Sequence, residues 1–355
     1  CLVNGILPQD LVEAVRRNCA LPEKVEGEGG IGANKDNSFN GLLFPCLEAQ
    51  YSCVNDVTLH PHIISACSQL LACAPSELRL SQSELWSKFN NVDVSATATA
   101  AAAAAPGPPS PFDTSSSQDQ RVHVDGFNHY LTFPTEWDKP EAVAMIVYYD
   151  DTSICGGGTC IVPRTGADDS AYHSQSEGES PLLSTPGGRS DLPWLNDRTT
   201  AEAYLLENSP EVHAFRRTLY SREKQVHAVP GTILFYRLDI WHRGVPLFPG
   251  GVRRVQNMIY KRQGTDWLNS WNAGSARNMY TKAQTVERII ATSTMHQRCV
   301  LGFPTADSTY WTPYTLAATK ARYKHLDCGL QHIEEIERNV KKREEEAQKN
   351  AFKVF

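Results

Sequence analysis

Two histidines and a carboxylate stand in this sequence at a spacing that could hold a metal ion. His123 and Asp125 are separated by one residue, in a short stretch that we expect to be extended. Residues i and i+2 of a strand point to the same face, so this imidazole and this carboxylate can share one ion. The second imidazole is His242, which follows the apolar run 229–235 where the chain turns. A His-x-Asp pair alone is weak evidence, because such pairs are frequent and more often structural.

An arginine downstream gives these three residues a more specific meaning. Arg253 lies eleven residues after His242, in a run that we expect to be a strand. Two imidazoles and one carboxylate form a facial set that leaves positions open on iron(II) for an oxoacid and dioxygen. Arginine pairs bidentately with carboxylates and keeps its charge when desolvated, which suits the distal carboxylate of 2-oxoglutarate. Arg254 then faces the other side of the strand, where we expect a solvated surface charge.

The elements that must position these residues are helices first and short strands later. Apolar residues recur at helical spacing in 9–18 and 60–72, and a further helix is expected from about Thr200 to Leu219. The expected strands are short apolar runs bounded mostly by Gly, Pro or Asp: 78–88, 122–125, 142–149, 159–162, 225–229, 232–237 and 253–260. Many short strands of this kind indicate a sandwich or a barrel.

Composition divides the chain into four parts. Residues 1–92 carry the N-terminal helices and the first strand. Residues 93–120 are rich in Ala, Pro and Ser and cannot bury enough apolar surface to offset their ordering entropy, so we expect a disordered insertion. Residues 121–325 hold the metal motif and the short strands, interrupted by a polar excursion at 166–223 that is compatible with a lid over a small substrate. The end, 326–355, is expected to be a charged helix that packs by one edge or contacts a partner protein.

Charge and cysteine usage narrow the class of protein. The net charge of −6 and the lack of a long basic stripe argue against a nucleic-acid partner. No run of about eighteen apolar residues could span a bilayer, and no signal peptide is visible, which favours an intracellular location. The chain begins with Cys1 rather than Met, so we expect an incomplete start. The ten cysteines are scattered, which favours reduced, partly buried thiols over a disulfide framework.

With these residues together, the chain resembles the phytanoyl-CoA dioxygenase family of 2-oxoglutarate-dependent oxygenases. The likeness covers about residues 1–325 and rests on four motifs: His123-Val124-Asp125, Gly157-Gly158-Thr159-Cys160-Ile161-Val162-Pro163, Pro230-Gly231-Thr232, and His242 followed by Arg253. The resemblance implies an α+β protein with a mainly β core, a double-stranded β-helix (jelly roll, cupin-like) flanked by helices. It also implies that Lys88 helps Arg253 to hold the oxoacid.

The resemblance further implies a hydroxylase-type oxidoreductase that uses iron(II), 2-oxoglutarate and dioxygen, with ascorbate as an auxiliary reductant. Such an enzyme releases succinate and carbon dioxide as it hydroxylates a C–H bond, here of a small or lipid-like substrate. Related halogenases leave the position of Asp125 vacant for a halide, so its presence favours hydroxylation. After Pro163 the family commonly continues Gly-Ser-His, whereas this chain has Arg164-Thr165-Gly166, so the substrate is not carried over.

Two other classes stay open. A jelly-roll metal protein without oxygenase activity, such as a cupin-like isomerase or a binding module, would keep the metal ligands but would not need Arg253. An oxygenase acting on a macromolecule is the other alternative.

Several side chains near the motifs have plainer explanations than chemistry. His129 is either a group beside the metal or substrate or an ordinary exposed histidine, and Trp241 is expected to pack rather than to stack on a substrate. Of Tyr148 and Tyr149, which alternate on a strand, one should face the interior.

Overall fold

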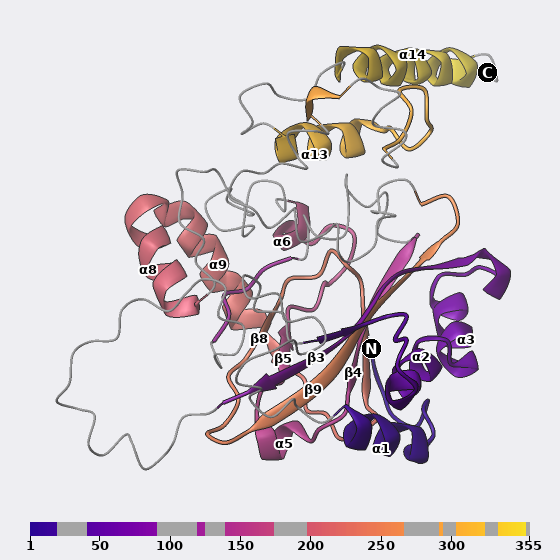
Figure 1. Ribbon diagram of the computed structural model, residues 1–355. Coiled ribbons are helices and arrows are strands. Elements are labelled where there is room, and N and C mark those ends of the chain that lie inside the picture. Colours follow the sequence, from indigo (N-terminus) through magenta and orange to yellow (C-terminus); the bar gives the residue numbers. More distant parts are fainter. Residues whose placement is uncertain are drawn as a thin grey trace. The chain divides into compact units, whose positions relative to one another are not determined.

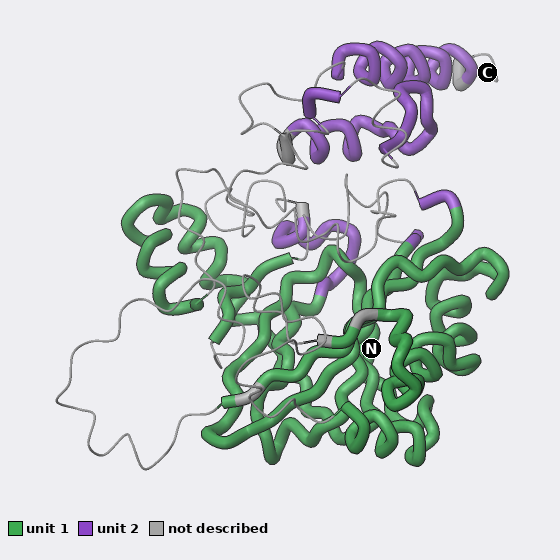
Figure 2. Tube along the Cα trace, viewed as in Figure 1, with its two compact units in different colours: residues 1–124, 142–163, 195–263 green, residues 125–141, 164–194, 264–355 purple. Residues whose placement is uncertain are grey.

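The computed structural model describes residues 1–19, 41–90, 119–124, 139–173, 197–265, 291–293, 303–323 and 333–352. Figure 2 shows that the chain divides into two compact units. The first unit comprises Cys1–Val124, Ala142–Pro163 and Leu195–Gln263, and the second comprises Asp125–Glu141, Arg164–Trp194 and Gly264–Phe355. Every strand of the described residues lies in the first unit. Most of the predicted insertion (93–118), together with Asp125 and His129, lies outside the described residues.

The larger of two sheets in the described residues has six antiparallel strands in the order β1-β7-β4-β9-β3-β2. Their bounds are β1 Leu2–Val3, β2 Gly41–Leu43, β3 Leu78–Phe89, β4 Ala142–Tyr148, β7 Ile233–Tyr236 and β9 Val252–Arg262. The strands predicted at 78–88, 142–149, 232–237 and 253–260 are therefore confirmed. The long β3–β9 pairing runs from Leu78 opposite Arg262 to Phe89 opposite Val252.

The smaller sheet has three antiparallel strands in the order β6-β5-β8. Their bounds are β5 Thr159–Ile161, β6 Lys224–Gln225 and β8 His242–Gly244. The strand predicted at 225–229 is wrong beyond Gln225, because the amide of Ala228 donates to the Thr152 hydroxyl at 2.9 Å instead of joining a ladder. The strand predicted from residue 122 is also wrong: residues 119–124 join β8 through an isolated bridge between His123 and His242.

The two sheets pack face to face. One buried apolar cluster contains Tyr148, Leu234 and Val255 from the large sheet, and it is joined by Ile161 of β5 and Val226 after β6. The Tyr148 hydroxyl also donates to the Thr159 hydroxyl at 2.7 Å, which links β4 to β5 directly. The fold is therefore a mixed arrangement of helices and antiparallel sheets with a sandwich core. The double-stranded β-helix stays a prediction.

Helices cover the outer face of the large sheet: α1 Gln9–Asn18, α2 Ser52–Thr58 and α3 Pro61–Leu70 (Figure 1). The helices predicted at 9–18 and 60–72 are thus confirmed. Side chains of these helices join Met145, Tyr149 and Met258 of the sheet in the main apolar core. Because both faces of the sheet are covered, Tyr148 and Tyr149 are both fully buried, on opposite faces. Tyr148 lies on the inner face, between the two sheets, so the prediction that one of the two faces the interior is confirmed.

The remaining helical segments are η1 Ala49–Tyr51, η2 Pro75–Glu77, α5 Thr152–Cys155, α6 Ser170–His173, α8 Arg198–Asn208, α9 Pro210–Arg222, α13 Pro313–Tyr323 and α14 Ile333–Phe352. The single helix predicted over 200–219 is wrong. Ser209 leaves helical geometry (φ −157°, ψ 69°), and Pro210 starts a new helix at its first position, where a missing N–H costs nothing.

None of the helices among the described residues has the length and apolarity needed to cross a membrane.

Candidate functional site

The structure brings His123 and His242 side by side. Their ring centroids are 4.6 Å apart, and their backbones exchange two hydrogen bonds of 2.8 Å each. His242 is opposite Ile161 in the β5–β8 pairing, so its side chain lies on the face of the small sheet that meets the large sheet. The ring of Tyr236 on β7 contacts His242 with centroids 5.5 Å apart. The two imidazoles therefore lie together at the interior of the sandwich, close enough to bind one cation.

Hydrogen bonds to the backbone set the tautomer of both histidines. The Nδ1 atom of His123 lies 3.0 Å from the carbonyl oxygen of Arg121, and that of His242 lies 2.9 Å from the carbonyl oxygen of Ile240. A carbonyl oxygen only accepts, so each Nδ1 carries the proton and donates it. The lone pair of each ring is then on Nε2, the atom through which such an oriented imidazole binds a metal.

The third predicted ligand, Asp125, lies outside the described residues. Within the described part of the chain, His, Cys, Asp and Glu side chains do not gather in groups of three or more that could hold a metal ion. The described residues thus place the two histidines of the predicted set, and the carboxylate stays a prediction.

Two cations meet on the inner face of the large sheet. Lys88 on β3 is directly opposite Arg253 on β9, and the neighbouring Trp86 and Val255 on the same face belong to the inter-sheet core. Arg253 is 6% exposed. Its Nη1–H donates to the carbonyl oxygen of Gly157, while its buried Nε has no hydrogen-bond partner. Among the described residues, neither cation forms an ion pair with a carboxylate.

The surroundings disfavour both charges. Burial and the adjacent Arg253 lower the pKa of Lys88 to about 7, and burial lowers the pKa of Arg253. A buried charge without a counter-ion is costly, and proteins tolerate it mainly where a partner supplies the missing charge. The Lys88–Arg253 pair is therefore suited to bind an anion with two or more oxygen acceptors, such as a carboxylate.

Gly157 shapes the space around Arg253. Its φ is +70°, and a Cβ at this position would lie 2.4 Å from Leu247 Cδ2 and 3.3 Å from Arg253 Cδ. Only glycine combines this backbone conformation with such close approach. The glycine motif named in the resemblance therefore has a structural role here: the Gly157 carbonyl oxygen accepts a hydrogen bond from Nη1 of Arg253.

Two other sequence interpretations can be compared with the structure. Trp241 is 1% exposed and contacts the ring of Phe215 edge-on at 6.2 Å, so its role in packing is confirmed. The prediction of a solvated Arg254 is wrong. Arg254 pairs with Asp150 through Nε at 2.9 Å and Nη2 at 2.5 Å, because helix α1 covers this face and its Arg16 carbonyl accepts a further bond at 2.7 Å.

Comparison with known proteins adds no family assignment. No protein-family model matches the sequence, and no curated protein matches it. Among solved structures, the chain is similar to EvdO2 from Micromonospora carbonacea var. aurantiaca complexed with 2-oxoglutarate (TM-score 0.43, 11% identity, 74% of this chain and 85% of that one). It is also similar to the non-heme α-ketoglutarate-dependent carbocyclase SnoK from nogalamycin biosynthesis (TM-score 0.42, 12% identity, 74% of this chain and 78% of that one). A third similar structure is HygX from Streptomyces hygroscopicus with nickel and 2-oxoglutarate bound (TM-score 0.39, 13% identity, 74% of this chain and 81% of that one). At scores and identities this low, the likeness carries no argument for this chain.

Proposed function

We propose that this protein is an iron(II)- and 2-oxoglutarate-dependent dioxygenase of the phytanoyl-CoA dioxygenase type. The observation that carries the proposal is the pair of cations on the inner face of the large sheet, the buried Arg253 and the partly buried Lys88, which have no carboxylate partner among the described residues. They lie on one inner face of a sandwich whose other sheet carries His242. A metal protein without an oxoacid cosubstrate would gain nothing from such a costly pair.

Each residue has a defined part in this proposal. His123, His242 and Asp125 would hold the iron, and the Nδ1–H bonds to backbone carbonyls would keep the two rings in a fixed tautomer. Arg253 would grip the distal carboxylate of 2-oxoglutarate with Lys88 beside it. When bound, the metal and cosubstrate supply the oxidising chemistry, in which 2-oxoglutarate and dioxygen yield succinate and carbon dioxide as a C–H bond is hydroxylated.

The apolar residues of the sandwich contribute by excluding water. Trp86 and Tyr148 flank Val255 on the strands beside it, one row from the Lys88–Arg253 pair. A dry environment strengthens the attraction between the guanidinium and a carboxylate. We further propose a small or lipid-like substrate, with Asp125 favouring hydroxylation.

The test compares Arg253→Ala with Arg17→Ala, an exposed arginine on α1. Calorimetric titration with 2-oxoglutarate is done without oxygen on protein loaded with cobalt(II). Arg253→Ala should weaken 2-oxoglutarate binding about 100-fold, because it leaves the carboxylate without its buried charge partner. Cobalt affinity should stay within about threefold, and Arg17→Ala should change neither.

Succinate release from 2-oxoglutarate with iron(II) and ascorbate then tests the reaction itself across lipid, acyl-CoA, amino-acid and terpenoid candidates. If Arg253→Ala binds 2-oxoglutarate as tightly as the wild type, the assignment is wrong. A wild-type protein that binds cobalt but no 2-oxoglutarate would instead point to a cupin-like metal protein.

A further inference from the structure

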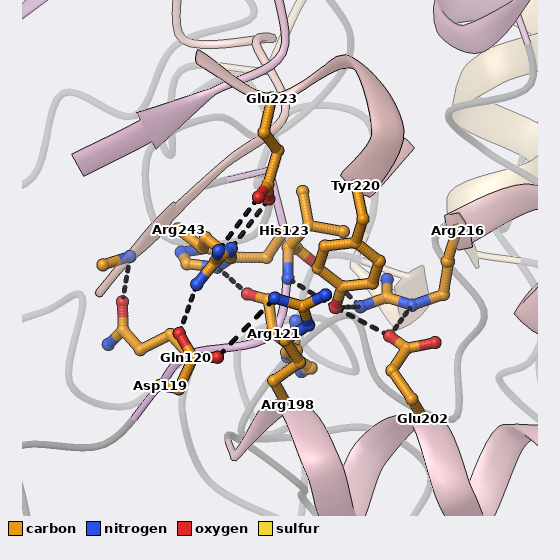
Figure 3. A network of polar contacts seen from close by, with 12 residues as sticks. Asp119, Gln120, Arg121, His123, Arg198, Glu202, Arg216, Tyr220, Glu223 and Arg243 are labelled. Carbon is orange, nitrogen blue, oxygen red and sulfur yellow. Dashed lines mark hydrogen bonds and ion pairs between the residues drawn. The ribbon is translucent and has the colours of Figure 1, made fainter. Parts of the chain in front are cut away.

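The residue before His123, Val122, is held by side chains of helix α9. Figure 3 shows these two side chains, Arg216 and Tyr220, joined by dashed lines to Glu202. The amide of Val122 donates to the Tyr220 hydroxyl at 3.1 Å, and the Val122 carbonyl accepts from Nη2 of Arg216 at 2.9 Å. In an extended segment beside a sheet, the backbone N–H and C=O groups usually bond to a neighbouring strand. The N–H and C=O of Val122 instead bond to side chains of one helix. The segment meets the small sheet at the bridge between His123 and His242 and through the Gln120 amide, which donates to the Gly244 carbonyl at 3.1 Å.

Glu202 of helix α8 ties the two α9 side chains together. The Nε of Arg216 donates to Glu202 Oε1 at 2.8 Å, and the Tyr220 hydroxyl donates to the same oxygen at 2.8 Å. Arg216 is 2% exposed, so its charge depends on this carboxylate. Burial raises the pKa of Tyr220 to about 12, so its hydroxyl stays protonated and can donate to Glu202 while it accepts from Val122.

A second group of contacts holds the start of the same segment, also drawn in Figure 3. Arg243 on β8 bonds to Asp119 and pairs with both oxygens of Glu223 at 2.7 and 2.9 Å. The amide of Gly244 donates to the Gln120 side chain at 2.8 Å. Residues 119–124 are therefore anchored at both ends by side chains, in place of the continuous ladder that a strand would have.

We propose that Glu202, Arg216 and Tyr220 are positioning residues that aim the His123 imidazole at the metal. The inference rests on the proposed function, since it concerns a ligand of that metal. The ring is tied through Nδ1 to the Arg121 carbonyl, so its orientation follows the peptides at 121 and 122. A ligand held in place before the metal arrives loses less freedom on binding, and removing such support typically weakens metal binding by about 10- to 100-fold.

The test is Tyr220→Phe, with Tyr149→Phe as the matched control. Tyr149 is fully buried whereas Tyr220 is partly buried, and the Tyr149 hydroxyl donates to Gln256 at 2.7 Å on the outer face of the large sheet. Cobalt(II) binding is measured by calorimetry without 2-oxoglutarate, and hydrogen exchange of the Val122 amide is measured in the metal-free protein. Tyr220→Phe should weaken cobalt binding about tenfold and speed exchange at Val122. Tyr149→Phe should lose at least as much stability, because its hydroxyl is the more deeply buried, and should change neither quantity.

Equal cobalt affinity in Tyr220→Phe and Tyr149→Phe would overturn the positioning role, while the effect of Arg253→Ala on 2-oxoglutarate would stand. A wild-type protein that binds neither cobalt nor 2-oxoglutarate would overturn both proposals. If Tyr220→Phe does not fold, Glu202→Gln decides, because it keeps an acceptor for Tyr220 but removes the charge that pairs with Arg216. It should weaken cobalt binding about threefold, and an unchanged affinity would contradict the inference.

Discussion

Two neighbouring arginines on β9 lie on opposite faces of the large sheet and have different polar partners. Arg254, on the outer face, has a two-point ion pair with Asp150 and donates to the Arg16 carbonyl. Arg253, on the inner face, donates to the carbonyl oxygen of Gly157, and its Nε has no hydrogen-bond partner. A second cation, Lys88, lies opposite it on the neighbouring strand β3.

In the proposed function, this difference separates a structural charge from a charge that binds a ligand. The outer pair is complete within the protein and links the sheet to α1. The inner pair has a desolvation cost that no described carboxylate offsets, and in the proposed function the distal carboxylate of 2-oxoglutarate would balance its charge. The arginines near Tyr220 resemble Arg254 in having acidic partners within the protein: Arg216 pairs with Glu202, and Arg243 pairs with Glu223.

The largest expected effect is on the free energy of unfolding, when Arg254 and Arg253 are each replaced by methionine. Arg254→Met should cost about 3 kcal/mol of unfolding free energy, because it removes the two-point ion pair of the buried Asp150 carboxylate and leaves it the more distant Arg16, at 3.8 Å. Arg253→Met should cost less than about 1 kcal/mol or stabilise the protein, since it removes a charge that has no acidic partner. Urea unfolding of metal-free protein without 2-oxoglutarate measures both. Equal losses would show that Arg253 is structural and would remove the distinction between the faces.

A smaller effect is expected at Gly157, compared with Gly250. Both have positive φ (+70° and +72°), but a Cβ would collide with Leu247 at Gly157 and would meet nothing within 4 Å at Gly250. Both alanine variants should lose about 1–2 kcal/mol from backbone strain. Gly157→Ala should lose about 1–2 kcal/mol more by overpacking and should also weaken 2-oxoglutarate binding, because the new methyl presses on Arg253. Denaturant unfolding and calorimetry measure the two losses, and identical behaviour of the variants would contradict this role.

The smallest effect concerns the pH dependence of 2-oxoglutarate binding. Burial and Arg253 place the pKa of Lys88 at about 7 in the empty protein, and a bound carboxylate favours the ammonium form. Affinity should therefore fall as pH rises through about 7, by about threefold between roughly pH 6.5 and 7.5. Calorimetry with cobalt-loaded protein measures this trend. Lys88→Met should bind more weakly and lose the trend, and a trend that survives the substitution would assign it to another group.

Local patterns in the sequence determined several features correctly. Helical spacing identified α1 and α3, and alternation along β9 placed Arg253 and Arg254 on opposite faces. These predictions succeed because the periods of helices and strands are properties of neighbouring residues. The spacing of His123, His242 and Arg253 predicted one site. The structure brings the two histidines together and places Arg253 on the inner face of the large sheet, and a shared site stays a prediction.

Tertiary contacts alone decided which charges have partners. Arg254 found Asp150 because α1 covers the outer face, and Lys88 lies opposite Arg253 because of the register between β3 and β9. The link from Tyr220 to Val122 likewise joins residues far apart in the chain. No local pattern encodes such pairs, since strand register and the covering of a face depend on contacts between distant segments. The sequence therefore selected candidate side chains by type and spacing, and the fold determined which of their charges have an ion-pair partner among the described residues.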